Sequence, residues 1–195
     1  MSTAGFSDHP VTGTVIGYRW WDLFLNGGTP RMWVESNHPQ SPTLCGAWGP
    51  WQAGVNQAEC LAFQQPTVIF SLSGARVMPS AAEHPWHTSV PEQRCHCGYW
   101  AFWGKPLYWR TLDVNSLSIL VNGIVPVLGV AEGWGRTLKG SLGFRCEYAK
   151  VTALLAPPAF KTLLSELQPQ AMIYTNPEAM FAEHPPGILE GNKTG

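Results

Sequence analysis

The chain has 195 residues, which is enough for one domain of ordinary size with a sizeable hydrophobic core. Its net charge of −1 and its low share of charged residues, 13%, exclude a global basic field for nucleic acid. No apolar run approaches the roughly 20 residues that a membrane-spanning helix needs, and no targeting segment is recognisable, so we expect a soluble, cytoplasmic protein.

The first quarter of the chain predicts two strands and a long loop. Residues 1–10 are mostly small and polar, and we expect them to be disordered or frayed. Residues 11–24 are rich in β-branched and aromatic side chains and predict a strand. A glycine-rich turn then leads to a returning strand over residues 31–35, and the prolines and glycines of residues 36–54 predict an ordered loop.

The middle of the chain combines short strands with two helices. Asn56 has the chemistry of a helix N-cap and predicts a short helix that ends near Phe63. Asp113 is a second N-cap candidate, for a helix with an apolar face over residues 114–121. Strand-like runs rich in β-branched or aromatic residues occur at 67–72, 98–103, 124–138 and 142–155.

The last of these strands and the segment after it carry clear periodicities. Alternation in residues 142–155 places Phe144, Cys146 and Tyr148 on one face, which puts the Cys146 thiol in the core. A proline pair then opens an amphipathic helix that ends at Leu167, and a weaker helical pattern follows over residues 177–183.

These elements predict an α+β fold that is rich in β-structure. We expect a single compact domain over residues 11–168, with antiparallel sheet and a few short helices, followed by a C-terminal extension over residues 169–195. The ten tryptophans fall in clusters, and we expect most of them to build the core. Trp20 and Trp21 are adjacent on a strand, so their side chains should point to opposite faces.

Three thiols and one imidazole predict a metal site. Cys60, His87, Cys95 and Cys97 form a set of the kind that closes a structural zinc site. His84 and His96 are alternatives to His87 as the nitrogen ligand. The pair Cys95 and Cys97 is separated by one residue, not the usual two, and Gly98 supplies the turn that such a pair needs.

The alternative interpretation is that these cysteines are ordinary buried thiols. Free cysteine packs as a small hydrophobe and is among the most buried residue types. Five cysteines in 195 residues are too few for a disulfide scaffold, and nothing in the sequence indicates an oxidising compartment. We therefore expect reduced thiols under either interpretation. Of the two, we favour the metal site, with Zn²⁺ as the cofactor in a structural role.

Several short motifs follow one another in an order that is also found in a group of other proteins. The motifs are Gly17-Tyr-Arg-Trp20, Trp51-Gln-Ala-Gly54, Ala58-Glu-Cys60, the run from His87 to Trp100, and the run from Gly129 to Arg136. In this order the chain resembles small proteins of actinobacteria and their phages that have no assigned activity. Those proteins carry a His-Glu pair before a Gly-Tyr-Arg-Ala-Glu motif. In this chain the pair is missing, and the motif reads Gly143-Phe-Arg-Cys-Glu147. The resemblance implies the same grouping of three cysteines and His87.

The motifs disfavour an enzyme. A zinc deaminase needs His-x-Glu and Pro-Cys-x-x-Cys, whereas this chain has Glu83 before His84 and a Cys-x-Cys pair. The His-Glu-x-x-His motif of metallohydrolases is absent from the sequence, and no local signature supports a Cys-His nucleophile pair. We therefore expect a protein without catalytic residues.

Two binding functions stay open. The favoured one is a zinc-stabilised binding or regulatory protein that contacts a protein partner; for a phage protein this partner would be a host protein. The alternative is a nucleic-acid-binding accessory protein that uses arginine and tryptophan to stack on single strands. The basic residues that would form its surface are Arg94, Lys105, Arg110, Arg136, Lys139, Arg145 and Lys150. The sequence leaves the oligomeric state open.

Overall fold

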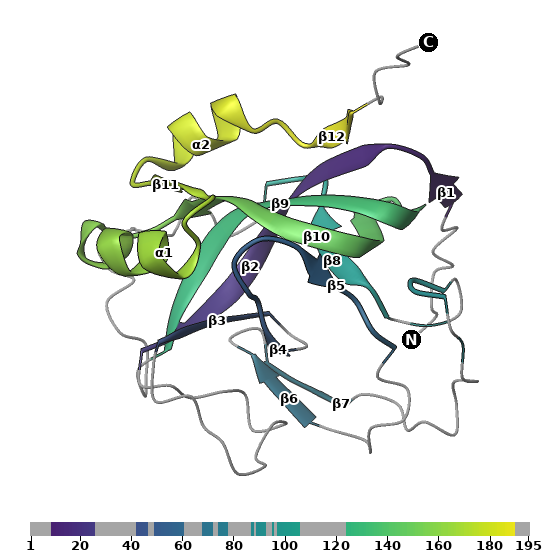
Figure 1. Cartoon of the computed structure of the whole chain (residues 1–195), viewed down its shortest axis with the longest axis horizontal. Helices are drawn as coiled ribbons and strands as arrows, with labels where there is room; N and C mark the ends of the chain where they lie inside the picture. Colours follow the sequence, from purple (N-terminus) through teal and green to yellow (C-terminus); the bar gives the residue numbers. More distant parts are fainter. Residues whose placement is uncertain are drawn as a thin grey trace.

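Two long antiparallel strands form the centre of the fold, β9 (Ile124–Lys139) and β10 (Gly143–Leu155) (Figure 1). They pair from Phe144 opposite Lys139 to Leu155 opposite Leu128. A backbone hydrogen bond of 2.8 Å from the Gly140 N–H to the Gly143 carbonyl closes the turn between them. Both strands predicted for this part of the sequence are confirmed.

The structure is a computed structural model, and it describes residues 9–25, 42–46, 49–60, 68–71, 74–77, 87, 89–92, 95, 97–105 and 124–189. For residues 49, 68–71 and 74–77, it describes the strands but not the side chains. The strand predicted at 31–35 and the helix predicted at 114–121 lie outside the described residues.

The strand predicted at residues 11–24 is present as two pieces, β1 (His9–Val11) and β2 (Thr14–Phe24). They are separated at Gly13, whose φ of 99° lies in the left-handed region that glycine adopts without strain. β2 pairs antiparallel with β9 from Val15 opposite Gly133 to Phe24 opposite Ile124. We also predict that residues 11–35 and 124–155 belong to one sheet system; this is confirmed for residues 11–24, whereas residues 26–35 lie outside the described residues.

Short strands extend this sheet on both sides. The remaining strands are β3 (Thr43–Gly46), β4 (Gly49–Pro50), β5 (Asn56–Gln57), β6 (Val68–Ser71), β7 (Gly74–Val77), β8 (Tyr99–Phe102), β11 (Met172–Tyr174) and β12 (Gly187–Leu189). β5, β8 and β11 pair with β10, whereas β3 and β12 pair with β2 and β4 pairs with β3. β6 and β7 form a separate hairpin.

The sheet curls because β8 pairs on both of its sides. Four residues of β8, from Tyr99 to Phe102, pair with β10, and Phe102 also lies opposite Tyr18 of β2. Since β2, β9 and β10 are already neighbours, β8 closes a ring of four strands. Among the described strands of the sheet, all pairs are antiparallel except β10 with β11, so the described part of the fold is a mixed, β-rich sheet with two short helices. The predicted fold class is confirmed.

The two faces of β2 pack into different clusters of apolar residues. Trp21, Val15 and Leu23 belong to the larger cluster, and Trp21 is 1% exposed. Trp20 packs with Tyr18 against the smaller cluster. The prediction that Trp20 and Trp21 point to opposite faces is thus confirmed. Of the six tryptophans in the described part of the chain, Trp21 and Trp51 are buried, and the other four are half-buried.

Each helix covers one of these clusters. The helix predicted to end at Leu167 consists of the 3₁₀ turn η4 (Pro158–Phe160) and α1 (Lys161–Leu167), and its Leu164 is buried in the larger cluster. α2 (Pro177–Glu183) buries Met180 and Phe181 in the smaller cluster. The residues beyond 168 thus contribute β11, α2 and β12 to the fold. The described residues contain no helix that is long and apolar enough to cross a membrane.

Three local predictions were wrong. The ordered loop predicted over residues 36–54 contains the strands β3 and β4, and β3 pairs with β2. Asn56 does not cap a helix; its side chain bonds to the backbone of Gln52 and Gly54, and it lies in β5 opposite Ala149. The alternation predicted along β10 also fails, because a register shift between Cys146 and Tyr148 turns Ala149 inward. Sequence alternation cannot locate such a bulge, since one extra residue reverses every side chain that follows.

Candidate metal centre

Cys60 and Cys97 are placed by strands that pair with β10. Cys60 follows β5, and the backbone N–H of Ala58 donates a 2.8 Å hydrogen bond to the Glu147 carbonyl. Cys97 is buried and lies two residues before Tyr99, the first residue of β8. Since both strands pair with β10, two distant parts of the sequence deliver their sulfurs to one place.

Cys95 and His87 complete the group from the segment between these strands. The N–H of Cys95 donates to the Glu92 carbonyl at 3.1 Å, which closes a turn in front of Cys97. Gly98 follows Cys97 with a φ of +104°. A Cβ at this position would also lie 2.9 Å from the Cβ of Pro91. The turn predicted after the Cys-x-Cys pair therefore requires glycine.

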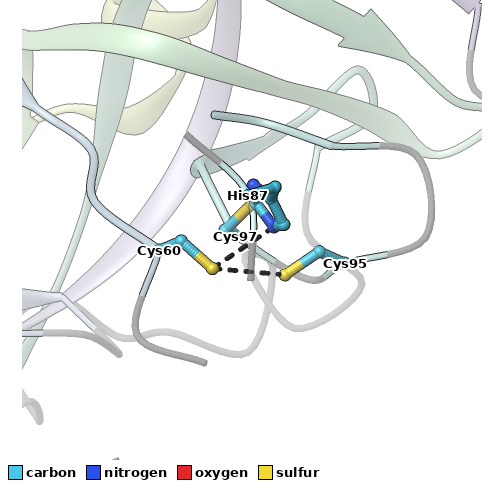
Figure 2. A group of neighbouring side chains, drawn as sticks. All are labelled: Cys60, His87, Cys95 and Cys97. Carbon is cyan, nitrogen blue, oxygen red and sulfur yellow. Dashed lines mark hydrogen bonds between the residues drawn. The ribbon is translucent and has the colours of Figure 1, made fainter. Parts of the chain in front are cut away.

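The four side chains point toward one another (Figure 2). One potential ligand atom from each of Cys60, His87, Cys95 and Cys97 lies within 4.8 Å of all the others. The Cys60 and Cys95 sulfurs are 3.8 Å apart, and His87 Nε2 is 3.3 Å from the Cys60 sulfur and 3.6 Å from the Cys97 sulfur. Ligands of one tetrahedral zinc are separated by about 3.8 Å for two sulfurs and about 3.5 Å for sulfur and nitrogen. The cluster can therefore hold a metal ion.

The second ring nitrogen of His87 fixes the orientation of the imidazole. Nδ1 lies 2.7 Å from the carbonyl oxygen of Ser89, which can only accept a hydrogen bond. The proton therefore resides on Nδ1, and the lone pair of Nε2 faces the sulfurs. Metal-binding histidines in proteins are held in this way by a hydrogen bond from the nitrogen that does not bind the metal.

The thiols of this cluster have unequal acidities. Burial opposes ionisation of Cys95, but hydrogen bonds with His87, Cys97 and Cys60 together hold its pKa below the ordinary value. For Cys97, burial and the nearby thiols raise the pKa to about 12. Three thiolates so close together repel one another, and a bound cation removes this repulsion.

The other two cysteines belong to the core. Cys146 is completely buried in β10, as predicted, and burial raises the pKa of its thiol to about 12. Cys45 in β3 is also buried, and burial raises its pKa to about 12 as well. Neither residue is part of the cluster of four. The alternative ligands His84 and His96 lie outside the described residues.

Sequence reasoning missed a buried arginine beside this cluster. Arg145 of β10 is 3% exposed, and its guanidinium donates to the carbonyl oxygens of Glu92, Cys95 and Cys97. Its position between Phe144 and Cys146, both expected to face the core, suggested that the side chain would face solvent. The one signal in the sequence is the low share of charged residues, 13%.

A second arginine, Arg136, contacts the segment that contains Glu92 and Cys95 through a partly exposed ion pair. Arg136 of β9 donates to the Glu92 carboxylate, with Nη2 and Oε2 3.1 Å apart. This ion pair is partly exposed and therefore contributes little to stability, but it joins β9 to the segment before Cys95.

No family model, curated protein or solved structure matches this chain.

Proposed function

We propose that this chain is a non-catalytic binding protein in which a structural Zn²⁺ ion, held by Cys60, His87, Cys95 and Cys97, stabilises the fold. The observation that carries the proposal is the donor set itself, because three separations among its sulfur and nitrogen atoms, 3.3, 3.6 and 3.8 Å, are close to those of ligands around one tetrahedral ion. A closed set of four protein ligands leaves no position for a substrate, which supports a structural role.

The chemistry of the donors favours zinc over other cations. Thiolate and imidazole are soft or borderline ligands, whereas magnesium and calcium prefer oxygen. None of the five cysteines forms a disulfide in the structure, and zinc binding requires this of the three proposed ligands. We accordingly propose a reducing compartment, the cytoplasm, as the place where this protein acts.

A surface at the end of β8 that lies away from Cys97 supports a protein partner. Phe102, at the end of β8, is 45% exposed, and Leu142, in the turn between β9 and β10, is 63% exposed. The Leu142 carbonyl accepts a 3.0 Å hydrogen bond from the N–H of Trp103, the residue after Phe102. Phe102 and Leu142 are therefore close to each other. Both also line a mainly apolar pocket together with Trp100. Exposed apolar side chains around a pocket are typical of protein interfaces.

The charges give less support to nucleic-acid binding. Among the basic residues predicted for such a surface, Arg145 is buried. Three others are paired with carboxylates, in the pairs Lys105 with Glu178, Arg136 with Glu92, and Lys150 with Glu132. A phosphate-binding surface needs basic groups that can release counterions, and paired groups do this less readily. Arg94 and Arg110 lie outside the described residues.

The double variant Phe102→Ser/Leu142→Ser should lose the partner while it keeps its zinc. The test is capture from a lysate treated with nuclease, with the tagged wild-type chain and the variant compared at equal zinc content. Given the resemblance to actinophage proteins, an actinobacterial lysate is the first choice. Val55→Ser is the matched control, because Val55 is 59% exposed but lies in the loop before β5.

Two results would redirect the proposal. If the wild type and the double variant retain a protein equally, Phe102 and Leu142 do not form the surface that binds it. Recovery of mainly DNA or RNA from an untreated lysate, with no enriched protein, would favour the nucleic-acid alternative.

A further inference from the structure

Arg145 reaches into the segment that carries two of the candidate ligands. Its Nη1 lies 3.2 Å from the Glu92 carbonyl oxygen and 3.3 Å from that of Cys97, and it also donates to the Cys95 carbonyl. Two of these three acceptors therefore belong to the ligand residues themselves. A shift of this guanidinium would move the backbone from which the Cys95 and Cys97 sulfurs project.

The guanidinium is itself held in place by its surroundings. Arg145 lies in β10 opposite Trp100 of β8, and its guanidinium carbon is 4.9 Å from the centre of the Trp100 ring. Gly98 leaves room for the start of this side chain, since a Cβ added at Gly98 would lie 3.4 Å from the Arg145 Cβ. The side chain, 3% exposed, is thus held by the sheet as well as by the loop that it binds.

The charge of Arg145 complements that of the proposed centre. Three thiolates and a neutral imidazole around Zn²⁺ leave one negative charge uncompensated. In a buried site a nearby cation stabilises this charge far more than it would in water. Arginine suits this place because it stays protonated and its planar group offers five N–H donors in a fixed geometry.

We propose that Arg145 is a positioning residue of the metal centre: it holds the backbone of residues 92–97 in the form that directs the two sulfurs at the ion, and its charge offsets that of the three thiolates. This inference rests on the zinc site proposed above. It adds a residue that binds no metal but sets how tightly the metal is bound.

Arg19 offers a matched control within the same structure. It is also buried, at 6% exposed, and its Nη1 donates a 2.6 Å hydrogen bond to the carbonyl oxygen of Trp100. Its guanidinium carbon lies 5.0 Å from the centre of the Trp51 ring. Arg19 thus resembles Arg145 in burial and in aromatic contact, but the carbonyl to which it donates belongs to β8 and not to a ligand residue.

The experiment measures zinc affinity by competition with a chromogenic chelator for the wild type, Arg145→Met and Arg19→Met. Positioning groups behind metal ligands typically change affinity by about 10- to 100-fold, and we expect a loss of this size for Arg145→Met. Arg19→Met should lower the melting temperature but leave the zinc affinity within about threefold of the wild-type value, well below that range. The absorption bands of bound Co²⁺ should shift in Arg145→Met only.

The variant Arg145→Lys separates the effect of the charge from that of the planar geometry. It also replaces Arg145→Met in the experiment if Arg145→Met does not fold. The ammonium keeps the charge but cannot reproduce the planar contacts, so we expect an intermediate affinity. Wild-type zinc affinity and an unchanged Co²⁺ spectrum in a folded Arg145 variant, or equal losses of affinity in the matched Arg145 and Arg19 variants, would overturn the inference. If the wild type itself binds no zinc, the proposed function fails instead.

Discussion

Cys97→Ser should lower the melting temperature of the zinc-loaded protein by roughly 8–16 °C. At a free zinc concentration a thousandfold above the dissociation constant, binding adds about 4 kcal/mol to the free energy of unfolding. For a domain of this size, each kcal/mol corresponds to about 2–4 °C. Cys97 is the buried member of the proposed ligand set, and its loss would remove the proposed link between the ion and the start of β8. Thermal unfolding followed by circular dichroism checks the shift.

Cys146→Ser is the matched control for this prediction. Its sulfur is completely buried in β10, but it belongs to the core and not to the cluster of four. The Cys146 sulfur lies 3.6 Å from the Tyr99 carbonyl, which a serine hydroxyl can also bind, so we expect the smaller loss of stability here. A strong chelator should lower the melting temperature of Cys146→Ser but not that of Cys97→Ser. Equal shifts for the two variants would argue against a stabilising metal.

Trp21→Ala should destabilise the fold by about 3–5 kcal/mol, whether or not metal is bound. The Trp21 side chain is 1% exposed and meets the Trp51 ring edge to face, with ring centroids 5.2 Å apart. Its removal leaves a cavity between the curled sheet and the loop that contains Trp51, and the strands around it cannot close this space. Urea unfolding of the zinc-loaded protein measures the change.

Trp20→Ala tests whether the loss depends on the face of the strand. Trp20 is adjacent in sequence and equal in size, but it is half-buried and packs against the smaller cluster. We expect less than half of the destabilisation found for Trp21→Ala. A larger loss for Trp20→Ala would mean that the smaller cluster, under α2, is the main support of the sheet.

The long strands could be predicted because their signal is local. Residues 124–138 and 142–155 are dense in β-branched and apolar side chains, and the structure places strands at Ile124–Lys139 and Gly143–Leu155. The weak helical pattern at residues 177–183 also corresponds to α2. In each case the pattern of apolar residues within the element is enough to predict it, so no distant partner is needed to recognise it.

Three features that depend on distant partners were not predicted. Asn56 has the side chain of a helix cap, but β10 is available to pair with it, and strand pairing prevails. The register shift after Cys146 is likewise set by pairing with β9, which no local pattern reveals. Ring closure through β8 depends on the pairing of Phe102 with Tyr18, two residues that are far apart in the sequence.

The candidate site was predictable from its chemistry and not from its geometry. Three thiols with one imidazole define a ligand set by their donor atoms alone, and the fold brings one such atom each from Cys60, His87, Cys95 and Cys97 within 4.8 Å of the others. The hydrogen bond from His87 to the Ser89 carbonyl and the contacts of Arg145 were not predictable. Both involve backbone carbonyls, which carry no signature in the side-chain sequence.

The proposed centre and the proposed partner surface share one strand. Trp100 of β8 packs against Arg145 and also lines the pocket beside Phe102 and Leu142. A metal ion that fixes the segment before β8 would therefore also hold the partner surface in shape. This connection explains how a metal without an open coordination position could still be needed for binding.

The most direct test of this account is the zinc content of the purified protein, measured by elemental analysis after expression in medium with all common transition metals. We expect one equivalent of zinc per chain in the wild type and in Cys146→Ser, and far less than one equivalent in Cys97→Ser and in Cys60→Ser. A metal-free wild-type protein with the same melting temperature before and after incubation with zinc would contradict the central claim.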